Sequence, residues 1–167
     1  GEAFIAAMRE DLPADLHGLA REIGLDLDAG IARFRQAMEA FANAESLLVA
    51  YSSLFLVPPS PARLNIGYYL DGTLLGNGTR VLMELYGRQG VAPSPALHDT
   101  PDHLVAVLEL LALLFHRADE AGEESRREEI LADAEVVRRL LLRALPKLSG
   151  QVRDAEKERA LPAFYSV

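Results

Sequence analysis

The sequence predicts an all-α fold, built as a single-domain helical bundle. Apolar side chains recur at spacings of three and four residues in every periodic segment, which is typical of helices with one buried face. The sequence shows neither an alternating strand pattern bounded by turn residues nor an internal repeat. Its 167 residues are enough to bury the core of one domain. We therefore expect one domain over residues 1–167.

The first part of the chain predicts two or three short helices. In the second of them, Leu16, Leu19 and Ile23 lie at helical spacing. Apolar side chains also line one face of the third helix, so that face needs a packing partner. The predicted helices cover residues 3–9, a segment opened by Asp11 and Pro13 and stopped by Gly24, and a segment that begins near Asp26 or Asp28.

The middle of the chain predicts three helices separated by turn residues. A helix that starts at Asn43 should end near Leu56, because Pro58 and Pro59 forbid its continuation. Gly76, Asn77 and Gly78 weaken the start of the third of these helices. The second and third helices are expected over residues 62–70 and 73–88, with Asp71-Gly72 between them.

A long loop should lead from these helices to the centre of the domain. Residues 91–100 contain two prolines and no periodicity, and a loop of about ten residues is often functional. Thr100 should cap the next helix, with Pro101 at its first position. That helix is apolar on almost every side, so we expect it to be central, with one face nearly fully buried. The expected buried face consists of Leu104, Leu108, Leu111 and Phe115.

The longest predicted helix covers residues 123–145. Acidic residues lie near its start and arginines near its end, as the helix macrodipole favours. Pro146 should end it. After Gly150 a short charged helix should run to about Ala160, followed by an aromatic tail over residues 162–165.

Composition excludes several classes of function. The formal net charge is −8 and the isoelectric point about 5.0, which disfavours nucleic acid and anionic membrane surfaces and favours basic partners. The chain has no cysteine, so disulfides, thiolate metal sites and thiol nucleophiles are excluded and a cytoplasmic location is expected. The longest apolar run, residues 104–115, is shorter than the about 20 residues of a membrane span.

Catalytic and metal-binding motifs are also missing from the sequence. Its four histidines form neither an HExxH motif nor a Glu-x-x-His pair. The glycines of residues 72–78 lack the Gly-Lys-Ser/Thr sequence of a phosphate-binding loop, and none of the serines lies in a G-x-S-x-G context. We therefore predict no catalytic residues, no metal and no cofactor, and a binding protein rather than an enzyme.

Four segments resemble the TorD/DmsD/NarJ family of chaperones that mature molybdenum-cofactor oxidoreductases. They match that family in order and spacing over residues 45–115, and Pro-Asp-His-Leu at residues 101–104 is the most specific part. Asp99 replaces a glutamate that the family often carries before this core. The segments are residues 51–59, which contain Tyr51-Ser-Ser-Leu54-Phe55, then Tyr69-Leu70-Asp71-Gly72, Tyr86-Gly87-Arg88-Gln89-Gly90, and Asp99-Thr100-Pro101-Asp102-His103-Leu104.

The resemblance implies a cytoplasmic chaperone that binds the N-terminal twin-arginine signal or leader of a molybdopterin oxidoreductase subunit before export. Such a ligand has two cations and an apolar stretch, so its receptor needs carboxylates beside an apolar groove. We expect Asp102 and His103 at the rim of a groove shared with Tyr51 or Tyr69, with Asp102 accepting an arginine. The residues that the resemblance assigns to client binding are Tyr51, Leu54, Phe55, Tyr69, Gly76, Asp99, Pro101, Asp102 and His103.

Several alternatives remain open from the sequence. Leu54 and Phe55 lie on an apolar stripe that could face the core, and Asp102 and His103 could serve only to satisfy backbone amides. A NarJ-type assembly factor would recognise a leader without an intact twin-arginine motif. A helical metal-dependent enzyme would use His103 with Glu109 and Asp102. The partners that the resemblance implies are the oxidoreductase catalytic subunit, proteins of molybdenum-cofactor biosynthesis, and a second copy of the chain in a homodimer.

Overall fold

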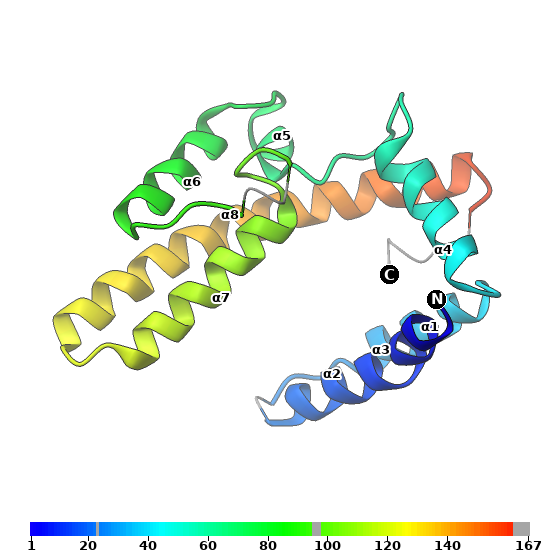
Figure 1. The fold of residues 1–167 in the computed structure, drawn as a ribbon, viewed down its shortest axis with the longest axis horizontal. Helices are drawn as coiled ribbons and strands as arrows, with labels where there is room; N and C mark the ends of the chain where they lie inside the picture. Colours follow the sequence, from blue (N-terminus) through cyan, green and yellow to red (C-terminus); the bar gives the residue numbers. More distant parts are fainter. Residues whose placement is uncertain (23, 95–97, 162–167) are drawn as a thin grey trace. The chain divides into compact units, whose positions relative to one another are not determined.

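The computed structural model confirms the all-α prediction (Figure 1). It describes residues 1–22, 24–94 and 98–161, so the predicted aromatic tail and Ile23 lie outside the described residues. Within these ranges the chain forms helices and no strand, apart from one isolated antiparallel bridge between Asn65 and His103. The elements are α1 (Glu2–Arg9), α2 (Asp11–Glu22), α3 (Asp28–Glu39), α4 (Ala44–Tyr51), the π-helix η1 (Ser52–Leu56), α5 (Ile66–Asp71), α6 (Asn77–Arg88), α7 (Leu104–Glu120) and α8 (Glu124–Glu158).

The chain divides into two compact units. The first comprises Gly1–Ala62 and Ser149–Val167, and the second comprises Arg63–Leu148. Helix α8 contributes residues to both units. The single domain over residues 1–167 stays a prediction, and each unit is described by itself.

In the first unit, α1, α3 and α4 enclose an apolar core. Its buried members Ile5, Met38 and Phe41 come from three segments, and Leu161 packs against them from the end of the described chain. Arg9 ties α1 to the end of α3 by donating from Nη2 to the Phe41 carbonyl at 2.6 Å. Two or three short helices were predicted before residue 40, and the structure has three there, α1, α2 and α3.

Local capping explains where α2 and α4 end or begin. Gly24 follows α2 with φ of +70°, a backbone region that favours glycine. Asn43 caps α4 through a reciprocal pair with Ser46, whose backbone N–H donates to Oδ1 of Asn43 at 2.9 Å. The predicted end near Leu56 is confirmed, although the last turn is a π-helix, in which the Val57 N–H donates to the Ser52 carbonyl at 2.9 Å.

In the second unit, α5 and α6 begin later than predicted, at Ile66 and Asn77 instead of residues 62 and 73. Gly72 ends α5 with φ of +73°, and Gly76 is extended, so the residues between them form a turn. Asp71 then caps α6, because its Oδ2 accepts from the Gly78 N–H at 2.6 Å. The predicted break at Asp71-Gly72 is confirmed, but the turn between the two helices is longer than predicted.

Helix α7 also begins later than predicted, at Leu104. The prediction that Thr100 caps this helix, with Pro101 at its first position, is wrong. His103 is extended and caps α7 at Leu104, with Nδ1 accepting from the Val105 N–H at 3.3 Å. The hydroxyl of Thr100 is instead hydrogen-bonded with the side chains of Asn65 and Asp102. A turn therefore precedes α7 where the sequence predicted its first helical turn.

The predicted buried face of α7 is wrong. Leu108 and Phe115 are 47% and 46% exposed, and Leu104 and Leu111 are half-buried. Because α7 is apolar on nearly every side, periodicity could not select the face that packs. The face that is buried is rotated from the predicted one and consists of Ala106, Val107, Leu110, Leu114 and Ala118.

The expected break at Pro146 is wrong as well. Helix α8 continues through Pro146 to Glu158. The proline ring is exposed and removes one backbone donor, whereas Ala144, Leu148 and Val152 are buried on either side of it. Packing of these residues outweighs the loss of a single hydrogen bond.

Candidate functional site

The side chain of Asp102 joins three segments of the second unit. It is fully buried, and its Oδ2 accepts from the Gly67 N–H at 3.1 Å and from Oγ1 of Thr79 at 3.0 Å. Its Oδ1 is hydrogen-bonded with Oγ1 of Thr100. The backbone carbonyl of Asp102 accepts from the Ile66 N–H at 2.9 Å. Asp102 thus fixes the loop before α7 against the starts of α5 and α6.

This arrangement requires glycine at residue 67. A Cβ atom on Gly67 would lie 2.5 Å from Oγ1 of Thr79 and closer still to Oδ2 of Asp102. The sequence analysis did not identify Gly67 or Thr79, because they are 35 and 23 residues from Asp102 along the chain. The expectation that Asp102 lies at a groove rim is wrong, since its carboxyl oxygens face buried donors.

Asp99 is the exposed carboxylate of the same loop. Its Oδ1 accepts from Nδ2 of Asn65 at 2.8 Å and from the Thr100 N–H at 2.6 Å. Partial burial raises the pKa of Asp99, but these hydrogen bonds and the nearby His103 more than offset burial and hold the pKa below its usual value. Asp99 is therefore an ionised carboxylate on the loop surface at neutral pH.

An open hollow adjoins Asp99. It encloses about 610 Å³ beside the loop before α7. Three of its lining residues, Ser94, Asp99 and Thr100, have side-chain oxygens, which are the kind of acceptor that a cationic donor needs. The lining residues that the structure describes are Pro93, Ser94, His98, Asp99, Thr100 and Pro101.

His103 and Pro101 are half-buried, and each has a structural contact. The ring of His103 caps α7, as described above. The carbonyl of Pro101 accepts from the Tyr86 hydroxyl at 3.3 Å, and the Ala106 carbonyl lies 3.0 Å from the same hydroxyl. Burial and, to a smaller extent, the nearby Glu109 and Asp102 raise the pKa of Tyr86 to about 12, so Tyr86 stays a donor.

Tyr69 and Gly76 have packing roles in the second unit. Tyr69 is 7% exposed, and its hydroxyl accepts from the Arg63 N–H at 3.1 Å while its carbonyl accepts from Nζ of Lys147 at 2.6 Å. Burial raises the pKa of the Tyr69 hydroxyl. A Cβ on Gly76 would lie 2.6 Å from Oδ2 of Asp71, so Gly76 permits the cap of α6.

The remaining predicted site residues lie on α4 and η1 of the first unit. Leu54 is fully buried and belongs to the core. Tyr51 and Phe55 are half-buried, with ring centroids 5.1 Å apart at an interplanar angle of 44°. Leu48 of α4 and Leu56 of η1 are 60% and 57% exposed. We call these four residues, Leu48, Tyr51, Phe55 and Leu56, the aromatic face.

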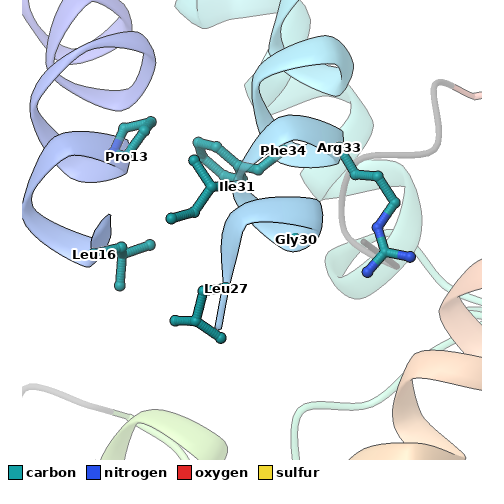
Figure 2. A pocket seen from close by; sticks show the side chains of 7 residues that line it. All are labelled: Pro13, Leu16, Leu27, Gly30, Ile31, Arg33 and Phe34. Carbon is teal, nitrogen blue, oxygen red and sulfur yellow. The ribbon is translucent and has the colours of Figure 1, made fainter. Parts of the chain in front are cut away.

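A pocket that the sequence analysis missed lies between α2 and α3 of the first unit (Figure 2). Its volume is about 250 Å³. Figure 2 shows Leu16 and Ile31 pointing toward the space between the two helices, while Arg33 extends away from Leu16. The available sequence signal was the apolar stripe of each helix, which contains Leu16 in α2 and Ile31 and Phe34 in α3. The pocket is lined by Pro13, Leu16, Leu27, Gly30, Ile31, Arg33 and Phe34.

The part of the chain that the structure describes contains no group of three or more His, Cys, Asp or Glu side chains able to hold a metal ion. For the alternative site of His103, Asp102 and Glu109, the carboxyl oxygens of Asp102 are bound to Gly67, Thr79 and Thr100. In the same described ranges, every helix is too short or too polar to cross a membrane.

The family model of the nitrate reductase delta subunit matches residues 11–146, and the chain therefore belongs to this family. Its members are maturation chaperones or assembly factors of molybdoenzymes rather than catalysts, and they act with nitrate reductase-type subunits. Searches of curated proteins and of solved structures found no match to this chain.

Proposed function

We propose that this chain binds the N-terminal signal or leader of a molybdopterin oxidoreductase catalytic subunit in the cytoplasm and assists cofactor insertion and assembly before export. The observation that carries the proposal is the aromatic face, which belongs to the best-matched segment of the chain. Its four side chains are apolar or aromatic, and two of them are more than half exposed. An apolar stretch of a leader would bury this surface and gain most of its affinity there.

Asp99 is the proposed acceptor for a cation of the leader. Its carboxylate is exposed and its pKa is low, so it carries a charge at neutral pH. An exposed ion pair of this kind contributes about 0 to 1 kcal/mol and mainly steers association. Asp102 then has a different role from the one first expected, because it holds the loop that presents Asp99. The aromatic face and Asp99 belong to different units, and each is tested by its own variant.

Co-purification tests the client. The full chain, carrying an affinity tag, should capture an oxidoreductase catalytic subunit that mass spectrometry identifies as a molybdopterin enzyme. Deleting the N-terminal leader of that subunit should abolish capture, while a wild-type subunit produced at the same level serves as control. Equal capture of the leaderless subunit would contradict the proposal, because binding would then not depend on the leader.

A NarJ-type assembly factor is the second candidate, favoured by the match to the nitrate reductase delta family. Such a protein would bind a leader that lacks an intact twin-arginine motif. Replacing both arginines of the captured client's leader by glutamine distinguishes the two. If the arginine replacements weaken binding to the wild-type chain but not to D99N, the leader is a twin-arginine signal. If they leave the affinity for the wild-type chain unchanged, the second candidate is indicated.

A further inference from the structure

The end of η1 lacks two hydrogen bonds within the helix, because two prolines follow it in the sequence. In a π-helix, each carbonyl accepts from the N–H five residues later, as Ser52 does from Val57. The next two carbonyls, of Ser53 and Leu54, would need N–H groups from Pro58 and Pro59, which proline lacks. The helix that carries Phe55 therefore ends with two carbonyls that need other donors.

Both carbonyls find donors elsewhere in the first unit. The Leu54 carbonyl accepts from the Ala62 N–H at 3.2 Å. The Ser53 carbonyl accepts from Nη1 of Arg159, which lies just beyond α8 and 106 residues away along the chain. The same Nη1 donates to Oγ of Ser53 at 2.9 Å, and Nη2 donates to the Pro59 carbonyl at 3.2 Å. One guanidinium therefore contacts η1 and the turn that follows it.

We propose that Arg159 is a positioning residue that caps η1 and thereby fixes Phe55, and with it the aromatic face, for leader binding. This inference rests on the proposed function. A cation at a helix C-terminus is favoured by the macrodipole and by the unpaired carbonyls there. The planar fork of arginine reaches the Ser53 and Pro59 carbonyls together, which the single ammonium of lysine cannot reproduce in the same geometry.

Hydrogen exchange tests the capping without any ligand. In Arg159→Gln, amide exchange over residues 52–57 should become faster than in the wild type, while exchange in α6 and α7 stays the same. Arg159→Lys should recover part of the protection. Arg153→Gln, an exposed substitution near the end of α8, is the matched control and should leave exchange unchanged. Unchanged exchange at residues 52–57 in R159Q would overturn the capping role.

A double-mutant cycle tests positioning as distinct from general stability. The probe is the leader peptide of the captured client. R159Q alone should weaken binding by about tenfold, and the effects of R159Q and F55A should be strongly non-additive because Arg159 acts through Phe55. Additive losses would overturn the positioning role. Failure of the wild type to bind the peptide would instead contradict the proposed function, and hydrogen exchange would still decide whether Arg159 caps η1.

Discussion

Replacing Asp102 by alanine should destabilise the protein strongly, because it leaves buried donors without an acceptor. The Gly67 N–H and the Thr79 hydroxyl both donate to Oδ2 of Asp102, and both residues are buried. An unsatisfied buried donor costs about 1 to 3 kcal/mol, so the two together cost about 2 to 6 kcal/mol. For a chain of this length, a loss of about 3 kcal/mol lowers Tm by roughly 6 to 12 °C.

Thermal unfolding followed by circular dichroism measures this loss. D99N is the matched control, since Asn keeps the Oδ1 acceptor and Asp99 is exposed, and we expect a change within about 0.5 kcal/mol. Thr79→Val removes one of the two donors together with its need for an acceptor, so it should cost less than D102A. A Tm of D102A within roughly 2 °C of the wild type, the effect of about 1 kcal/mol or less, would refute the assignment of Asp102 as the buried anchor of the loop.

Three further predictions follow from single residues. Pro146→Ala should raise the free energy of unfolding, measured by urea titration, by about 1 kcal/mol or more, because alanine restores the N–H donor to the Leu142 carbonyl within a continuous helix. A loss of stability in this variant would contradict the continuity of α8. Gly67→Ala should lower it by about 1 to 3 kcal/mol, because the new methyl group overlaps Oδ2 of Asp102, and an unchanged urea midpoint would count against the packing described. The pKa of Asp99 is lowered on folding, so its contribution to stability and to cation binding is present above its ordinary value of 3.8 and is lost as pH falls through the lower folded value. Peptide affinity should therefore differ between wild type and D99N from pH 7 to about pH 5, and a difference that vanishes above pH 5 would contradict this pKa direction.

Helix boundaries that depend on residues within one turn of the chain were predicted well. Asn43 and Gly24 mark a helix start and a helix end by local capping chemistry, and the structure confirms both. Pro146 shows where a local rule fails, because the burial of Ala144 and Leu148 keeps α8 continuous. The face of α7 failed for another reason: apolar residues surround the helix, and only packing decides which of them are buried.

The candidate site was predicted by residue type and motif but not by environment. The motif drew attention to Asp102, yet its burial depends on Gly67 and Thr79, which no local pattern links to it. The same holds for Arg159, which contacts Ser53 from the far end of the sequence. Sequence reasoning identified Phe55 as a candidate, whereas only the structure shows that its ring is half-buried beside Tyr51.

Calorimetric titration of the client's leader peptide tests the central claim most directly. The wild type should bind the peptide, and added salt should weaken binding without abolishing it, because exposed ion pairs contribute little. F55A should lose about 1 to 3 kcal/mol of binding free energy and D99N about 0 to 1 kcal/mol, with folding intact in both. Equal affinity for a scrambled peptide of the same composition, or no loss in F55A, would contradict leader binding at the aromatic face.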